Sequence, residues 1–550
     1  MRMFGNCRKR GLATDSRMPD NPKDKAAQLK AEGNALFVQR EYALAYHKYG
    51  DTIECDGENA ILYANRAACS LAMRKYLDAA SDASKATKLD PDYPKAWARL
   101  ATAQAGLQEI ENSIESWKKA LAALPVMNLN DKKQEEAKKE SASVPFPLIP
   151  SINLNQMPWS RALAMIPEAI QSGQGGRTSA WVIGGAYNDF AKGVEMMKQL
   201  QEHPLSGTRG PKVLVGKLGA IAEITNGIMR DERVFHMPES DWITKYNKQM
   251  EFECAKWKAW TEGGVQAVID GAQERLRNGG WNDVRPAIAT TVRAYIMRAF
   301  LESGLRSNHQ LSSELYGRVV EILEWGRRAW KDVSRDDRGV VFEDSFLRGV
   351  RSMRLEVQMM GYAQDPGPNS KFPLADLLED AQDMIREMET ATDDQPTDCD
   401  PGFLMSFWLY PKGRAAAMIG FYHAQMASQC IKDGEEDEVI RDHFVKAAAS
   451  YVDAATTYPP DDENHVWFLH CALQAMYSCG APVTVFLSTV KRLRLAIPDM
   501  NKIWEFSVNS PMHLHENAIQ RDLELEKVIQ EKLEKGEYTL DSIIAPQPER

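Results

Sequence analysis

Three consecutive segments near the beginning of the chain have the same length, 34 residues, and start at Ala26, Ala60 and Pro94. Small residues recur at matching places in these segments, where two helices must touch: Gly33, Ala67 and Ala101; Ala45, Ala79 and Ser113; Thr52, Ala86 and Ala120. Pro91 and Pro125 close the second and third segments, at points where proline cannot continue a helix. A period of this length predicts pairs of helices that bury their apolar faces by stacking on one another. The sequence therefore predicts a helical array over residues 26–127.

Five polar residues lie on the first helices of the three segments: Lys30, Asn34, Asn65, Lys95 and Arg99. Lys30 and Asn34 are four residues apart, as are Lys95 and Arg99, so each pair shares one face of its helix. The first helices of stacked repeats line the concave surface, and these side chains should therefore converge on one groove. Two ammoniums, a guanidinium and two amides supply the donors needed to hold a terminal carboxylate and a nearby acidic side chain. The pattern predicts a carboxylate-binding groove; the alternative is a set of solvated polar residues on a repeat scaffold.

This stretch resembles the tetratricopeptide repeat, and its five polar positions are similar to the two-carboxylate clamp of tetratricopeptide co-chaperones. The resemblance covers residues 26–127, although the first repeat has Gly57 where proline is usual and Leu36 where an aromatic residue is common. It implies that the groove binds the C-terminal Glu-Glu-Val-Asp tail of the seventy- and ninety-kilodalton heat-shock chaperones. It also implies that Phe37 and Ala68 help to form an apolar pocket for the valine of that tail.

The composition bears on whether the chain binds nucleic acid, spans a membrane or lies in an oxidising compartment. The net charge is −10 and the pI is near 5.7, which argues against non-specific nucleic-acid binding. No long uncharged apolar run occurs, so no membrane-spanning helix is predicted. The eight cysteines form no Cys-x-x-Cys pair and are interpreted as reduced thiols, which favours a cytoplasmic protein.

Shifts in composition divide the chain into segments. Residues 1–18 are rich in basic residues, which could indicate a mitochondrial presequence, but their glycines and low apolar content favour a disordered arm. Met18 could be the functional start. A charged run over residues 131–141 predicts a helix that caps the repeats. The predicted order is a disordered basic arm over 1–25, three repeats over 26–127 with a capping helix to 142, a Pro-rich connector over 143–159, a helical domain over 160–536 and a tail over 537–550.

The larger domain is predicted to be almost entirely helical. Ala448, Ala455 and Pro460 repeat the spacing of small residues and proline in the second repeat, which favours a tetratricopeptide-like solenoid over a compact bundle. Residues 210–219 could form a short strand. Long amphipathic stretches cover residues 178–200, 240–277, 284–304, 312–333, 342–362, 374–390, 415–431, 438–457 and 463–477, and a charged helix is predicted over 516–535.

Little in the sequence indicates catalysis. A Gly-rich segment over residues 173–176 lacks the preceding strand and the following Lys-Ser/Thr that a phosphate-binding loop needs. His465, His470 and Cys471 flank aromatic and apolar residues and are interpreted as core rather than as metal ligands. The sequence therefore predicts a non-enzymatic, all-α adaptor or co-chaperone with no catalytic residue, metal or cofactor, whose helical domain binds a second, unidentified protein. Two alternatives remain open: a scaffold that recognises another acidic C-terminus, and an enzyme with an unrecognised site in the helical half.

Overall fold

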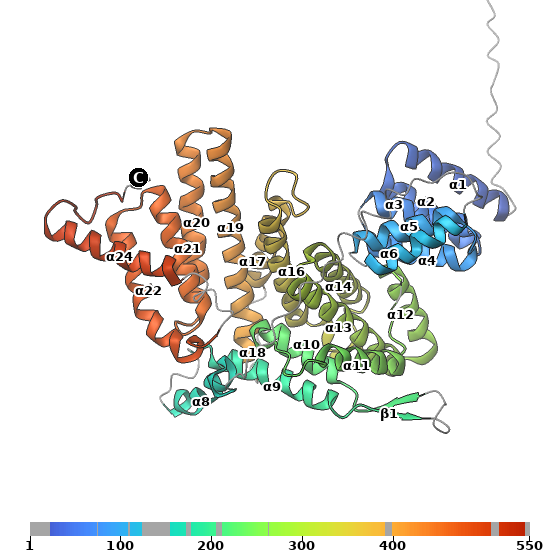
Figure 1. Cartoon of the computed structure of the whole chain (residues 1–550), viewed down its shortest axis with the longest axis horizontal. Coiled ribbons are helices and arrows are strands. Elements are labelled where there is room, and N and C mark those ends of the chain that lie inside the picture. The colour runs from blue at the N-terminus through green and yellow to red at the C-terminus, as the bar shows by residue number, and fades with distance from the viewer. Residues whose placement is uncertain are drawn as a thin grey trace, which may run out of the picture. The chain divides into compact units, whose positions relative to one another are not determined.

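The computed structural model describes residues 22–73, 75–107, 110–123, 154–171, 178–204, 212–261, 263–390, 399–507 and 516–544. The chain divides into two compact units: the first comprises residues 1–146 and 262–264, and the second comprises residues 147–261 and 265–550. Helices make up nearly all of the secondary structure in the described residues (Figure 1), which confirms the predicted all-α fold. The predicted capping helix lies outside the described residues, as do most of the predicted arm and most of the connector.

Three successive helical hairpins form the described part of the first unit. They are α1 (Pro22–Val38) with α2 (Tyr42–Cys55), α3 (Ala60–Ala72) with α4 (Tyr76–Leu89), and α5 (Pro94–Gly106) with α6 (Ile110–Ala122). Each hairpin packs on the next, and Ala45, Ala67, Ala79 and Ala101 are fully buried where the helices meet. A Cβ added to Gly33 would lie 3.0 Å from the Tyr49 ring, so the approach of α1 to α2 depends on this small residue. These contacts confirm the tetratricopeptide fold predicted for this unit.

An ion pair ties the two helices of the second hairpin together. Arg66 donates from Nε and Nη2 to the two carboxylate oxygens of Asp82, at 2.8 and 2.7 Å. Asp82 is only 6% exposed, so water weakens this interaction little. The parallel pair of hydrogen bonds fixes the direction of both side chains as well as their separation.

Two helices begin earlier than the sequence predicts. α1 starts at Pro22, inside the predicted arm over 1–25, and α8 (Pro158–Gln171) starts at Pro158, inside the predicted connector over 143–159. Proline is favoured in the first turn because the N–H groups there have no acceptor within the helix, and because its φ is already helical. The sequence boundaries placed the helix starts after these prolines, whereas the helices include them.

The second unit is a succession of helices with one β-hairpin among its described residues. In chain order after α8, the longer elements are α9 (Ala180–Met197), β1 (Gln201–Pro204), β2 (Lys212–Val215), α10 (Ala220–Arg230), α11 (Trp242–Trp257), α12 (Val265–Gly279), α13 (Trp281–Arg306), α14 (His309–Ala329), α16 (Asp344–Gln364), α17 (Leu374–Thr390), α19 (Tyr410–Asp433), α20 (Asp437–Thr457), α21 (Glu463–Cys479), α22 (Val483–Trp504) and α24 (Glu516–Glu534). Short helical turns are η1 (Leu154–Gln156), η3 (Glu232–Val234), α15 (Arg335–Arg338), η4 (Val340–Phe342), α18 (Pro401–Leu404) and the π-helical η5 (Met405–Leu409). β1 and β2 pair antiparallel, so the short strand predicted within residues 210–219 is confirmed.

Most of the predicted helical stretches coincide with observed helices, and α17 has the predicted bounds. The stretch over residues 240–277 is wrong as a single helix, because it is divided into α11 and α12. Lys258 ends α11 in the left-handed region, with φ of 49°, and Gly263 follows with φ of 100°. A left-handed residue turns the chain out of the helix while its N–H still closes the last turn.

The C-terminal helices pack in the order in which they occur in the chain. α19 lies beside α20, α20 beside α21 and α21 beside α22, and α19 with α20 forms a long hairpin (Figure 1). This sequential packing is the arrangement that a solenoid requires. The buried carboxylate of Asp522 holds α24 against α21. It accepts a hydrogen bond from Gln474 Nε2 at 2.8 Å and bonds to His470 Nδ1 at 2.5 Å. None of the helices within the described ranges combines the length and the apolar character needed to cross a membrane.

Candidate functional site

The first helices α1, α3 and α5, together with α2, surround a hollow of about 250 Å³. Its walls are formed by Asn34, Phe37, Val38, Tyr49, Asn65, Ala68 and Arg99. Five of the seven residues predicted to form the site therefore lie around one space. The other two, Lys30 and Lys95, are not in its wall; each lies one helical turn before a wall residue, Asn34 or Arg99.

The two asparagines in the wall turn their amide oxygens toward protein donors. Tyr49 donates its hydroxyl to Asn34 Oδ1 at 2.7 Å, and Arg99 Nη1 donates to Asn65 Oδ1 at 3.4 Å. With each oxygen engaged, each side chain still has its NH₂ group to offer. The hollow therefore combines two amide donors with a guanidinium, which is a donor set suited to carboxylate oxygens.

The positive charge at the hollow has no acidic partner among the described residues. No carboxylate there lies within ion-pair range of Lys30, Lys95 or Arg99. Burial lowers the pKa of Arg99, and the neighbouring Tyr93 and Tyr49 offset part of this effect. A guanidinium stays charged at neutral pH even so, because its ordinary pKa is so high. Arg99 is thus a partly dehydrated cation, and a ligand carboxylate would supply the missing counter-charge.

Tyr49 is a wall residue that sequence reasoning missed. It lies on the second helix of the first repeat, four residues after Ala45, with its ring against Gly33. An aromatic residue at this position of the repeat is expected to lie in the core, and Tyr49 is only 2% exposed. Burial raises the pKa of its hydroxyl to about 12, so the group remains a hydrogen-bond donor to Asn34. The one sequence feature that could have indicated this role is the hydroxyl group, because a buried hydroxyl needs a hydrogen-bond partner and phenylalanine would fill the same space without one.

We expect Tyr49→Phe to weaken binding at the hollow with little loss of folding stability. The variant keeps the ring against Gly33 but frees Asn34 to rotate, so binding must then order that side chain, which costs about 0.5–1.5 kcal/mol. Titration of an acidic C-terminal peptide should therefore show a threefold to tenfold loss of affinity, roughly what that energy implies. Tyr76→Phe on α4 is the matched control, because Tyr76 does not line the hollow. Equal affinity in the two variants would mean that Tyr49 does not position Asn34.

The apolar part of the wall consists of Phe37, Val38 and Ala68. Phe37 packs edge-on against Tyr42, with ring centroids 5.3 Å apart. Val38, which was not predicted, is 82% exposed although it is apolar. An exposed aliphatic side chain beside polar donors suits a ligand with an apolar residue close to its carboxylate.

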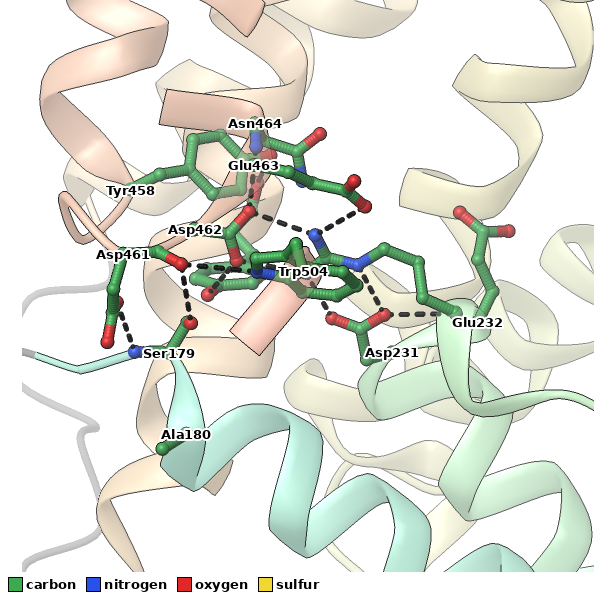
Figure 2. Close-up of polar contacts among 12 residues, drawn as sticks. Ser179, Ala180, Asp231, Glu232, Tyr458, Asp461, Asp462, Glu463, Asn464 and Trp504 are labelled. Atoms are coloured by element: carbon green, nitrogen blue, oxygen red, sulfur yellow. Dashed lines mark hydrogen bonds and ion pairs between the residues drawn. The ribbon is translucent and has the colours of Figure 1, made fainter. Parts of the chain in front are cut away.

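A second group of charged residues lies in the helical unit, around Arg233 in η3. Figure 2 labels its acidic members Asp231, Asp462 and Glu463. Arg233 contacts the carboxylates of Asp231 at 2.6 Å, Asp462 at 2.9 Å and Glu463 at 3.1 Å. These three acidic residues are at most 8% exposed. The guanidinium also lies 4.2 Å from the ring centroid of Trp504. We call this group the Arg233 joint; it connects η3 to the start of α21 and the end of α22, and its burial suits a structural role.

A carboxyl pair adjoins the Arg233 joint. Arg414 lies 3.1 Å from Glu232 and 2.7 Å from Glu356, and the two carboxyl groups also bond to each other. Burial and the nearby Glu356 charge raise the pKa of Glu232 to about 8. Burial alone would also raise the pKa of Glu356, but Arg414 and the hydrogen bond from Glu232 hold it below its ordinary value. At neutral pH the pair therefore holds one proton, on Glu232.

This shared proton predicts a pH dependence of folding stability. A carboxyl group whose pKa is raised in the folded state stabilises the fold while it is protonated, and it loses that contribution as pH rises. We therefore expect the stability of the helical unit to fall between about pH 4.5 and pH 8. Glu232→Gln keeps a neutral donor and should remove this component, as measured by urea denaturation across that range. Glu251→Gln, at an exposed site on α11, is the control; a variant and control with the same pH profile would contradict the shared proton.

The histidines interpreted as core from the sequence are buried in the structure. His465 is 6% exposed and bonds through Nδ1 to the carbonyl of Ala455 at 2.6 Å, and His470 is 7% exposed. Across the described ranges, no group of three or more His, Cys, Asp or Glu side chains is arranged to hold a metal ion.

Comparison with known proteins extends the resemblance seen in the sequence. No family model matches the chain. The heat shock protein sti1 homologue of Schizosaccharomyces pombe is 37% identical over 120 residues, 22% of this chain and 20% of that protein. The small glutamine-rich tetratricopeptide repeat-containing protein 2 of Saccharomyces cerevisiae is 38% identical over 99 residues, 18% of this chain and 29% of that protein. The chain thus spans less than a third of the length of these relatives.

Among solved structures, the second tetratricopeptide domain of human RPAP3 was determined in complex with the HSP70 peptide SGPTIEEVD. It is 34% identical and covers 22% of this chain and 97% of that domain, with a TM-score of 0.20. The family predicted from the five polar positions and the repeat is confirmed at this level: part of the chain is similar to the tetratricopeptide domains of heat-shock co-chaperones.

Proposed function

We propose that this chain is a non-enzymatic adaptor whose first unit binds the acidic C-terminal tail of heat-shock chaperones of the seventy- and ninety-kilodalton classes. The observation that carries the proposal is the convergence of Asn34, Asn65 and Arg99 on one hollow without an acidic partner among the described residues. Lys30 and Lys95, one turn away on α1 and α5, would extend the positive charge along the peptide. The complex of the similar RPAP3 domain with an HSP70 peptide supports this choice of ligand.

The donor set accounts for a moderate affinity. Each charge-assisted hydrogen bond contributes about 1.5–3 kcal/mol. Ordering a flexible peptide tail offsets much of that gain. We therefore expect a dissociation constant on the order of micromolar.

Calorimetric titration of the full chain with the peptide SGPTIEEVD tests the proposal. The free-acid peptide should bind, and the same peptide with an amidated C-terminus should bind at least about tenfold more weakly, because it lacks the terminal charge. Binding should also weaken as salt is raised, since the hollow is open to solvent and screening acts over about 10 Å at 0.1 M salt. Equal binding of the two peptides would contradict a carboxylate-binding groove, whereas a preference for acidic tails of another sequence would favour the alternative scaffold.

The helical unit is proposed to be a binding surface for a second protein. Its sequential helices offer the extended faces that solenoids use for protein partners. Removing residues 160–540 should eliminate at least one co-purifying protein while the peptide still binds. Turnover of any substrate by the purified full chain would instead favour an enzyme. The cytoplasmic location inferred from the cysteines stays a prediction.

A further inference from the structure

Two histidines face each other across the α19–α20 hairpin. His423 on α19 and His443 on α20 approach with their Nδ1 atoms 3.0 Å apart and their ring centroids 5.2 Å apart. Both side chains are half-buried, so solvent reaches the pair. At this distance one neutral ring donates Nδ1–H and the other accepts with its Nδ1 lone pair. The two nitrogens therefore point at a common position between the helices.

Charged and aromatic side chains lie around the pair. Burial, the neighbouring His443 and Lys446 lower the pKa of His423 to about 4. Asp442 lies close enough to act in the opposite direction, but its carboxylate is engaged by Lys446 at 2.6 Å. On α19, the Tyr422 ring packs edge-on against His423 at 5.0 Å. The two charged residues beside the pair, Asp442 and Lys446, are therefore bound to each other.

We propose that His423 and His443 bind a divalent transition-metal ion, of the Zn²⁺ or Ni²⁺ class, through their two Nδ1 atoms. With metal–nitrogen bonds of about 2.0–2.1 Å, the observed separation corresponds to an N–metal–N angle of about 91–97°. That angle suits octahedral or square-planar coordination, and a slight opening of the hairpin suits a tetrahedral ion. Water would complete the coordination shell, because the described residues provide no third ligand.

Metal binding at this pair requires a change of tautomer rather than a loss of protons. In the free pair, one ring carries its proton on Nδ1, within the hydrogen bond. The metal takes both Nδ1 lone pairs, so that proton leaves Nδ1 while the Nε2 of the same ring takes up one from solvent. Both rings then carry Nε2–H, and no net proton is released. The ion would join α19 to α20 between positions 20 residues apart in the chain and so stabilise the hairpin.

Titration of tag-free full chain with ZnCl₂ and NiCl₂, followed by calorimetry and by the thermal unfolding midpoint, tests this site. One equivalent should bind and raise the midpoint, because the ion binds only the folded pair. His423→Ala and His443→Ala should each lose affinity by about tenfold or more while keeping the helical circular dichroism. His203→Ala, at an exposed position on β1, should bind as the parent does.

Charge next to the pair provides a second test that does not remove a ligand. Lys446→Gln removes the ammonium that opposes a cation at this place and should strengthen binding. Binding that persists in both histidine variants, or no binding at millimolar metal, would overturn the proposal. The helical circular dichroism of each variant, compared with that of the parent, shows whether the helical unit is folded.

Discussion

Replacing Arg99 by alanine should lower the affinity for an acidic C-terminal peptide by about tenfold or more, equivalent to about 1.4 kcal/mol. Arg99 is the cation in the wall of the hollow, and it donates to Asn65 while lacking an acidic partner among the described residues. A ligand carboxylate would pair there with a partly dehydrated guanidinium through charge-assisted hydrogen bonds. Calorimetry on the full chain gives this difference directly. Lys95→Ala, one turn away, should also weaken binding.

The same variant should leave the fold intact. Burial lowers the pKa of Arg99, which means that the folded protein already disfavours this charge. Its removal should therefore change the free energy of unfolding by only about 0.5 kcal/mol. Arg99→Lys separates charge from shape, since an ammonium keeps the charge without the planar fork. Lys75→Ala, at an exposed residue outside the hollow, controls for the loss of positive charge. A large fall in melting temperature for Arg99→Ala would mean that the residue is structural.

Replacing Arg233 by methionine should destabilise the helical unit by about 3–5 kcal/mol. The substitution leaves the carboxylates of Asp231, Asp462 and Glu463 close together and buried without their shared cation. It also removes the guanidinium from the face of Trp504. Urea denaturation followed by tryptophan fluorescence measures the loss, with the two units fitted as separate transitions.

An exposed arginine provides the comparison for this prediction. Arg306 pairs with Glu302 at 2.8 Å, but its side chain is 68% exposed. Surface pairs of this kind contribute at most about 1 kcal/mol, so Arg306→Met should cost far less than Arg233→Met. Equal costs at the two positions would show that burial of the three carboxylates contributes little to the stability of this unit.

The repeat spacing was sufficient to predict the first unit because its helices make mostly local contacts. Gly33, Ala45 and Ala79 recur where helices touch, and the structure buries them where one helix meets the next. Helix positions in the second unit were also predictable, as α17 illustrates, because each helix carries its own apolar periodicity. The end of α11 was not predictable, because the residue that leaves the helix in a left-handed conformation is Lys258 and not a glycine.

Some residues of the candidate groove could likewise be predicted from the sequence, and others were found only in the structure. Residue types and spacing were enough to select Asn34, Asn65 and Arg99, because residues four apart share a helix face and repeats align those faces. The spacing could not show that Tyr49 orients Asn34 from the second helix, or that Val38 completes the wall. Those relations depend on how two helices cross rather than on the period of either.

By itself, the sequence determined the helical class, the repeat and the polar set of the first unit, since these follow from periodicities within single helices. Only the tertiary structure decided the Arg233 joint, in which Arg233 meets Asp462 from 229 residues away in the chain. Only it placed His423 against His443 on neighbouring helices. Such pairs form because the packing of the helices brings together two segments that are far apart in the sequence. The residue pattern within one segment does not show which distant segment it will contact.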